Sequence, residues 1–153
     1  MDIRAHVPDT ICDHLSSLGA RFDAEIYHYD EYFEVRDIVL RVRLSAQQCF
    51  LTLICNAREW TEEIMHPEII CALLRDSAAK KVASIDKHRK IYRLDDFLIH
   101  VDRIHGLGFF LEVKSPRARD FMINVLKISA DNIITQGYME LVNTYGKDYS
   151  ELH

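Results

Sequence analysis

The segment at 101–114, VDRIHGLGFFLEVK, constrains the fold most, because it predicts two β-strands joined by a short turn at Gly106 and Gly108. Apolar and polar residues alternate on both sides of the turn, and successive side chains of a strand point to opposite faces. One face of this hairpin therefore carries Asp102, Glu112 and Lys114, and the other is apolar. Many strands keep one polar face in water, so the hairpin alone does not define a site.

The same alternation recurs along the chain and predicts eight strands, at 2–7, 21–33, 38–44, 47–55, 58–64, 80–93, 97–102 and 109–114. Helical spacing of apolar residues predicts helices at 8–18, 67–74, 121–126 and 133–142, with a frayed tail after them. In most strands one face is aliphatic and the other is charged. The helices need an apolar surface to pack on, so we expect the aliphatic faces to point outward and the charged faces inward. The predicted fold is α+β: a closed eight-stranded antiparallel barrel with helices outside.

Length and composition fit one ordinary globular domain. The chain has 153 residues, of which 48% are hydrophobic and 28% charged, and we expect a single domain over 1–145 with a tail at 146–153. A net charge of −5 disfavours a nucleic-acid partner. Apolar runs are too short to span a membrane, and the start lacks a signal-peptide layout, so we expect a cytoplasmic protein. The four cysteines and eight histidines are scattered and form no zinc motif.

Four motifs resemble those of the CYTH family, and they occur along the chain in the family's order. This family, also called triphosphate tunnel metalloenzymes, contains class IV adenylyl cyclases and thiamine triphosphatases. The hairpin at 101–114 is similar to the family's Asp, Gly-Leu-Gly and Leu-Glu-x-Glu pattern. LRVR at 40–43, after DEYF at 30–33, resembles its Leu-Arg-x-Arg strand, and KHRKIY at 87–92 its Lys-x-Arg-x-x-Tyr. GYMELV at 137–142 is similar to its C-terminal tyrosine-containing helix.

The resemblance implies a protein that binds a triphosphate-containing anion, as a nucleotide, thiamine triphosphate or tripolyphosphate, with Mg²⁺ or Mn²⁺ as cofactor. Arginine forks match phosphate oxygens, and hard divalent cations take carboxylate oxygens. The implied phosphate ligands are Arg4, Arg41, Arg43, Lys87 and Arg89, with Lys114 as an added cation. The implied metal side consists of Asp2, Glu62, Asp102 and Glu112.

The chain departs from the family pattern mainly on the metal side. Met1 stands where the family's first glutamate is expected, Lys114 replaces the second glutamate of the hairpin, and Trp60 replaces a glutamate of the strand at 58–64. Ile54 stands where a lysine is expected. A lysine in place of a glutamate changes the local charge by two units and opposes a bound cation. The phosphate-binding half of the pattern is thus kept better than the metal half.

Two functions from different classes remain open at this point. The first is a metal-dependent phosphohydrolase or adenylyl cyclase-like enzyme, and the second is a CYTH protein that binds polyphosphate or nucleotide without turnover. Asp102 and Glu112 could instead be structural partners of the arginines. Lys87 and Arg89 lie in a generally basic stretch that could simply be solvated. His100 lies on the Asp102 face, where a hydrogen-bonded histidine is an alternative to a proton shuttle.

Overall fold

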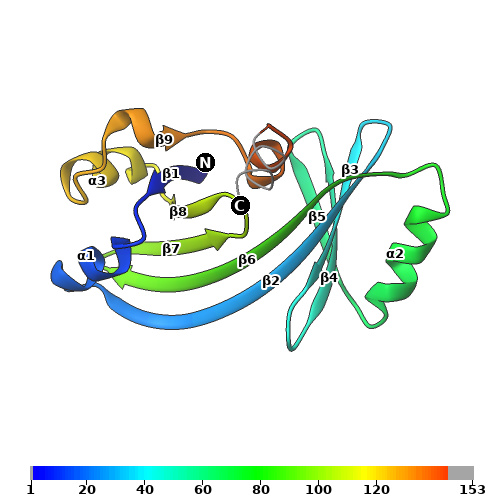
Figure 1. Cartoon of the computed structure of the whole chain (residues 1–153), viewed down its shortest axis with the longest axis horizontal. Coiled ribbons are helices and arrows are strands. Elements are labelled where there is room, and N and C mark those ends of the chain that lie inside the picture. Colours follow the sequence, from blue (N-terminus) through cyan, green and yellow to red (C-terminus); the bar gives the residue numbers. More distant parts are fainter. Residues whose placement is uncertain (1, 145–153) are drawn as a thin grey trace. The chain divides into compact units, whose positions relative to one another are not determined.

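The computed structural model describes residues 2–144 of the chain (Figure 1). The elements, in chain order, are β1 (Asp2–Val7), α1 (Ile11–Ser17), β2 (Arg21–Val35), β3 (Ile38–Leu44), β4 (Cys49–Cys55), β5 (Arg58–Ile64), α2 (Pro67–Arg75), β6 (Lys80–Leu94), β7 (Phe97–Ile104), β8 (Gly108–Lys114), α3 (Ala118–Asn124), the 3₁₀ turn η1 (Ala130–Asn132), β9 (Ile133–Ile134) and a last helix at 138–144. The eight predicted strands are all present within a few residues of their expected ends. The predicted tail at 146–153 lies outside the described residues.

The chain divides into two compact units that share the long strands β2 and β6. The first unit contains residues 1–26 and 88–137, and the second contains residues 27–87 and 138–153. The hydrogen-bonded strand order is β5-β4-β3-β2-β6-β7-β8-β1-β9. Each neighbouring pair whose register is described is antiparallel. The α+β class and the antiparallel pairing are therefore confirmed.

The prediction of a closed eight-stranded barrel is wrong. The sheet has nine strands, and among the described residues β5 and β9 end the strand order without pairing to each other. Ile133 and Ile134 were expected to start a helix, but they form β9, which pairs with Ala5 and Arg4 of β1. This added strand occupies the edge of β1 that closure of the sheet would require. Alternation identifies the polar face of each strand but does not specify which strand pairs with the last one.

Tight turns connect the strands, and their backbone angles fit two-residue hairpins. Asn56 and Ala57, between β4 and β5, both have positive φ, of 49° and 62°. A type I′ turn requires positive φ at both central positions, and its twist matches that of the flanking strands. Arg36 begins the β2–β3 turn in the same region of backbone angles, with φ of 53°. The turn predicted at Arg36 and Asp37 is confirmed, and it fixes the register of the β2–β3 pair.

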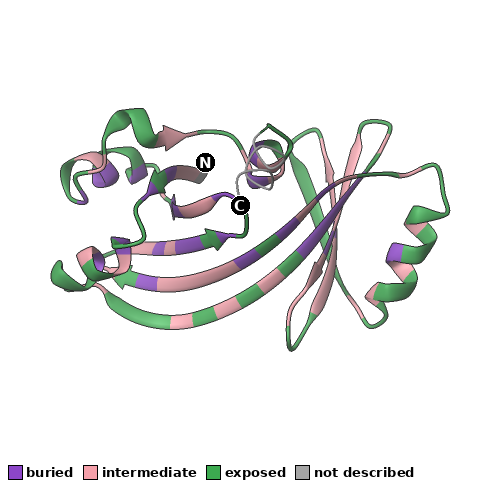
Figure 2. Ribbon diagram, in the orientation of Figure 1, coloured by how far each residue is buried: buried purple, intermediate pink, exposed green. Residues whose placement is uncertain are grey.

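The first unit has its core under α1 and α3. The apolar face of β1, β7 and β8 meets these helices through a buried cluster, which contains Ala5, Val7, Ile11, Leu15, Tyr92, Ile99, Val101, Leu111, Val113, Ala118, Phe121, Met122 and Leu126. Figure 2 shows the buried residues of this unit concentrated in the same strands and helices. Because this face is filled by helices, the polar face of β7 and β8 is the one that carries Asp102 and Glu112.

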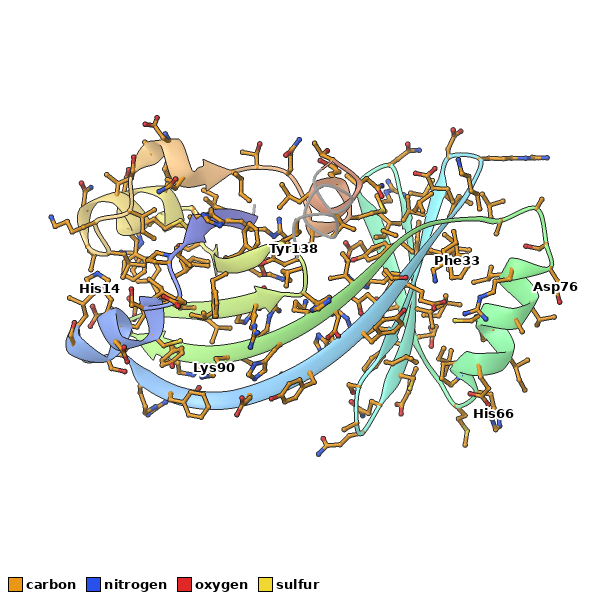
Figure 3. All side chains as sticks on the ribbon, in the orientation of Figure 1. His14, Phe33, His66, Asp76, Lys90 and Tyr138 are labelled. Carbon is orange, nitrogen blue, oxygen red and sulfur yellow. The ribbon has the colours of Figure 1, made fainter. Side chains whose placement is uncertain are left out.

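The second unit packs α2 on one face of β2, β3 and β4. Phe33, Val42 and Cys71 are its most buried apolar residues, and Figure 3 shows Phe33 on the side of the sheet that faces α2. Pro67 begins α2 at a position where a missing N–H costs nothing. Arg75, at the other end of α2, donates to the Glu31 carboxylate over 3.1 and 3.2 Å. The opposite face of these strands therefore remains available for Arg41 and Arg43.

In the described chain, residues 2–144, no helix is long and apolar enough to cross a membrane.

Candidate functional site

The second unit gathers charged residues on the face of β2 and β3 that is turned away from α2. We call this set the Arg41 cluster; it consists of Asp30, Arg41, Arg43, Thr52 and Lys87. The registers place Asp30 opposite Arg43, and Tyr32 opposite Arg41 and then Thr52. Residues that are directly opposite one another in a ladder share a face. The predicted common face of Arg41 and Arg43 is therefore present in the structure.

The two arginines of this cluster have different partners. Arg43 donates to Asp30 from Nε to Oδ1 over 2.8 Å and from Nη2 to Oδ2 over 2.7 Å. Arg41 instead donates from Nη2 to the Thr52 hydroxyl over 3.3 Å, and that hydroxyl lies 3.0 Å from the Thr61 hydroxyl. Arg41 Nε is buried and has no hydrogen-bond partner among the described residues. An unpaired buried donor is costly, so this N–H is suited to an incoming acceptor.

Asp30 stays ionised because of its cationic neighbours. Its side chain is almost completely buried, and burial by itself raises the pKa of a carboxyl group. The hydrogen bonds and charge of Arg43, and then the charges of Lys87 and Arg41, outweigh burial and lower the pKa of Asp30 below its usual value. The cluster thus contains three cations and one carboxylate. Its composition favours an anionic ligand.

Lys87 contributes to this cluster from β6, and it is almost completely buried. Its Nζ lies 5.7 Å from the centre of the Tyr138 ring, within the range of a cation–π contact. Tyr138 begins the helix at 138–144, and its position on that helix is labelled in Figure 3. The sequence pattern singled out this helix but gave Tyr138 no role. The contact shows that Tyr138 helps to hold Lys87.

The first unit contains a second charged set, which we call the Glu112 cluster: Arg4, Arg89, His100, Asp102 and Glu112. Arg89 donates to Asp102 from Nε over 2.7 Å and from Nη2 over 2.8 Å. Arg4 Nη2 lies 2.9 Å from Glu112 Oε2. Arg89 Nη2 and His100 Nδ1 lie 3.6 and 3.5 Å from the other oxygen of that carboxylate. The structure therefore brings together Arg4, Arg89, Asp102 and Glu112, whose two positive and two negative charges balance.

The pKa of Glu112 is strongly perturbed by the groups around it. Burial raises its pKa, but His100 and the charges of Arg4 and Arg89 act in the opposite direction and lower it to about 2. Glu112 is therefore an anion at any physiological pH. The two guanidiniums that hold it ionised lie against different oxygens of its carboxylate, Arg4 against Oε2 and Arg89 against Oε1.

One predicted residue, Glu62, lies apart from these clusters. Glu62 is exposed on β5 and pairs with Leu51, so it lies on the α2 side of the sheet and not on the Arg41 face. On β5, the residues that do share the Arg41 face are Glu59, Thr61 and Glu63. Lys114 is exposed at the end of β8, and its backbone pairs with Asp2 of β1.

The residues present do not fit a divalent metal as they are arranged. Among residues 2–144, no three histidine, cysteine, aspartate or glutamate side chains come together in a group that could hold a metal ion. Asp102 and Glu112, the two predicted ligands that lie together, are each engaged by a guanidinium. A divalent cation needs several oxygen ligands and would compete with these arginines for them.

Sequence reasoning did not assign a role to Asp30 or to Thr52. Asp30 belongs to the DEYF segment, and its spacing from Tyr32 places both on one face of β2. The signal that could have identified it is the two-residue turn at Arg36, which sets the register and places Asp30 opposite Arg43. Thr52 follows from the next register in the same way.

Comparison with known proteins identifies the family of the chain. The model of the CYTH domain matches residues 4–120. The chain belongs to the CYTH family. A relative from Methanocaldococcus jannaschii, named "Putative adenylate cyclase MJ0240", is 28% identical over 169 residues, which cover 92% of this chain and 97% of that protein.

Solved structures share the fold. The PH1012 protein of Pyrococcus horikoshii OT3 has a TM-score of 0.77 at 22% identity, covering 92% of this chain and 98% of its own. A Hippeastrum protein, described as "Putative adenylyl cyclase HpAC1 from Hippeastrum reveals a dominant triphophatase activity", has a TM-score of 0.65 at 16% identity. It covers 95% of this chain and 94% of its own. At these identities the likeness concerns the fold.

Proposed function

We propose that this CYTH protein binds a triphosphate-containing anion through Arg41, Arg43 and Lys87. The observation that carries the proposal is the state of Arg41. Its guanidinium is held by a neutral hydroxyl, that of Thr52, and its buried Nε is without a hydrogen-bond partner among the described residues. A phosphate oxygen supplies both the missing acceptor and the missing negative charge.

Arg41 is oriented for this role by its neighbours. Thr52 is completely buried and fixes one end of the guanidinium, so less side-chain freedom is lost when a ligand binds. Arg43 contributes charge while Asp30 fixes its position. Lys87 adds a point charge from a buried site. Several cations that converge on one face suit an anion with several charged oxygens, such as a triphosphate chain.

We further propose that binding in this protein exceeds turnover. Phosphoryl transfer needs the charge on the transferring group to be neutralised, and the metal ion usually does this. Here the carboxylates that the family resemblance assigns to the metal are neutralised by Arg4 and Arg89. The cations of the Arg41 cluster supply ground-state binding of the anion, which by itself does not accelerate a chemical step.

The alternative is a phosphohydrolase or adenylyl cyclase-like enzyme that uses Mg²⁺ or Mn²⁺. Two names support it: the M. jannaschii relative is called a putative adenylate cyclase, and the Hippeastrum protein is credited with triphosphatase activity. In that case Asp102 and Glu112 would have to exchange guanidinium partners for the metal. The small-molecule ligand would be a nucleotide or another triphosphate in either case.

Calorimetry and a phosphate-release assay test the proposal and separate the two alternatives. Tripolyphosphate, thiamine triphosphate and ATP are titrated into the protein with Mg²⁺, with Mn²⁺ or with a chelator. We expect at least one of these ligands to bind with chelator nearly as well as with metal, and phosphate release to be slow. Failure of all three to bind under every condition would overturn the proposed function. Rapid metal-dependent release would favour the enzyme.

A further inference from the structure

The first unit contains a pocket of about 530 Å³ that belongs to neither charged cluster. Three segments surround it: the end of β1 with the loop that follows, the helix α1, and the segment between α3 and β9. Every residue that lines the pocket belongs to the first unit. A pocket of this volume is large enough to hold a small organic molecule.

The floor of the pocket is apolar. It is formed by Val7, Ile11 and Leu126, which are almost completely buried. Pro8 and Ile128 add apolar surface higher on the walls. Water gains little from contact with such a surface, so an apolar group that displaces it is favoured. The floor therefore suits the hydrocarbon part of a ligand.

The rim of the pocket is polar and carries one positive charge. Its exposed side chains include Thr10, Lys127, Ser129 and Asn132. Thr10 precedes α1, yet its hydroxyl does not cap that helix, although threonine often does so. Among the described residues, no aspartate or glutamate lines the pocket. The rim thus offers an ammonium, hydroxyls and an amide to a ligand group with one negative charge.

Lys127 reaches the rim from an unfavourable backbone conformation. Its φ is 58°, and the helix end beside it is closed by the Ile128 N–H, which donates to the Met122 carbonyl over 2.9 Å. Glycine or asparagine usually takes a left-handed position after a helix, because a longer side chain is strained there. The other non-glycine residues with positive φ within residues 2–144 all lie in turns between neighbouring strands: Arg36, Asn56, Ala57 and Asp95. A lysine kept at this position suggests that its side chain is used.

The walls of the pocket are held in place without a ligand. His14 of α1, labelled in Figure 3, donates from Nε2 to the Leu126 carbonyl over 3.0 Å. This bond joins α1 to the segment after α3. The ring of His6 meets the Phe110 ring edge-on, with 5.4 Å between their centres, and the Ser129 hydroxyl accepts from the Asp131 N–H over 3.3 Å. A ligand therefore enters a pocket whose walls need little ordering.

We propose that this pocket binds a small amphipathic carboxylate, with its apolar body on the floor and its carboxylate beside Lys127. One cation on the rim matches one negative charge, whereas a polyphosphate needs several cations and has no apolar part to cover the floor. The ligand differs in class from the triphosphate that we assign to the Arg41 cluster. This site does not depend on the proposed function.

NMR titration of the ¹⁵N-labelled full chain tests the site with three probes. 2-Naphthoate has both parts of the proposed ligand, 2-naphthalenemethanol has the apolar body without the charge, and acetate has the charge without the body. We expect 2-naphthoate to shift the amide signals of residues 6–14 and 126–132 in a saturable way. Its affinity should exceed that of either other probe by about fivefold or more.

Two substitutions of Lys127 separate its charge from its backbone conformation. Lys127→Gln should weaken 2-naphthoate about fivefold and leave the binding of 2-naphthalenemethanol unchanged. Lys127→Gly should weaken 2-naphthoate equally, while the urea midpoint of unfolding rises, because glycine adopts positive φ without strain. Arg119→Gln, an exposed change on α3 outside the pocket lining, is the matched control and should alter neither property.

Three results would overturn the proposal. The first is the absence of saturable shifts at residues 6–14 and 126–132 up to the solubility limit of 2-naphthoate. The second is equal affinity for 2-naphthoate and 2-naphthalenemethanol in the unmodified protein. The third is full retention of 2-naphthoate affinity by the folded Lys127→Gln variant, as judged from its dispersed amide spectrum.

Discussion

Arg43 and Asp30 form a two-point ion pair across β2 and β3, with donor–acceptor distances of 2.8 and 2.7 Å. This pair separates the roles of the two arginines on β3. Arg43 is fixed by its own carboxylate, whereas Arg41, two residues earlier on the same face, is held by the uncharged Thr52. The difference makes Arg41 the residue on which an added anion should depend most.

Arg41→Ala should weaken the binding of tripolyphosphate by about 1.5–3 kcal/mol, the range for hydrogen bonds to charged groups. Isothermal titration calorimetry measures the loss. Arg41→Lys should recover part of the affinity, because it restores the charge without the planar fork. The control is Arg36→Ala, which removes an exposed arginine from the β2–β3 turn in the same unit. Equal affinity of the Arg41→Ala variant and the unmodified protein would contradict the assignment.

Asp30→Asn should lower the stability of the protein and raise its affinity for anions. The substitution leaves the Arg43 guanidinium without its carboxylate, and breaking a buried pair in this way costs about 3 kcal/mol of unfolding free energy. It also removes the negative charge of Asp30, so the net charge of the Arg41 cluster becomes more positive by one unit. Urea unfolding and calorimetry with tripolyphosphate measure the two effects. Glu34→Gln, which changes an exposed carboxylate on the same strand, should alter neither; a fall in affinity with Asp30→Asn would refute the charge argument.

Glu112 should make the stability of the protein depend on pH in the acid range. Its pKa is lowered from 4.5 to about 2 in the folded protein, so the folded state favours the ionised form. The stabilisation is fully present above the unfolded value and is lost as the pH falls from about 4.5 towards 2. Its size is about 3 kcal/mol by linkage.

Glu112→Gln tests this dependence. At pH 7 the variant should be less stable than the unmodified protein, and the difference should shrink as the pH approaches 2. Urea unfolding at a series of pH values measures both curves. Glu63→Gln, at an exposed position of β5, is the matched control and should follow the unmodified protein. Parallel curves for Glu112→Gln and the unmodified chain would show that Glu112 is not the group responsible.

Lys114→Glu should make anion binding more dependent on a divalent metal. Lys114 is two residues after Glu112 on the same face of β8, and a protonated ammonium has no lone pair to offer a cation. A carboxylate there would add an oxygen ligand beside Glu112 and remove an opposing charge. Calorimetry with tripolyphosphate, with Mg²⁺ and with chelator, measures the difference. Arg119→Glu, an exposed change in the same unit, is the control. If Lys114→Glu and the unmodified chain respond identically to Mg²⁺, Lys114 has no part in the metal response.

Local pattern in the sequence was sufficient for the strands and for the faces that they present. The alternation at 101–114 predicts that Asp102 and Glu112 share a face opposite the core, and the structure confirms it through Arg89 and Arg4. The resemblance to the CYTH family is likewise confirmed by the family match over residues 4–120, which contains every motif except the one at 137–142. These features depend on the two-residue period of a strand, which a single sequence displays directly.

Only the tertiary structure decided which residues meet across strands and where the sheet ends. The pairing of Asp30 with Arg43, and the placement of Glu62 on the α2 side, follow from registers that turns fix, and a shift of one residue reverses every face. Ile133 and Ile134 have apolar side chains that suit a helix or a strand, and the open edge of β1 made them a strand. Non-local pairing of this kind depends on residues far apart in the sequence, so local periodicity could not reveal it.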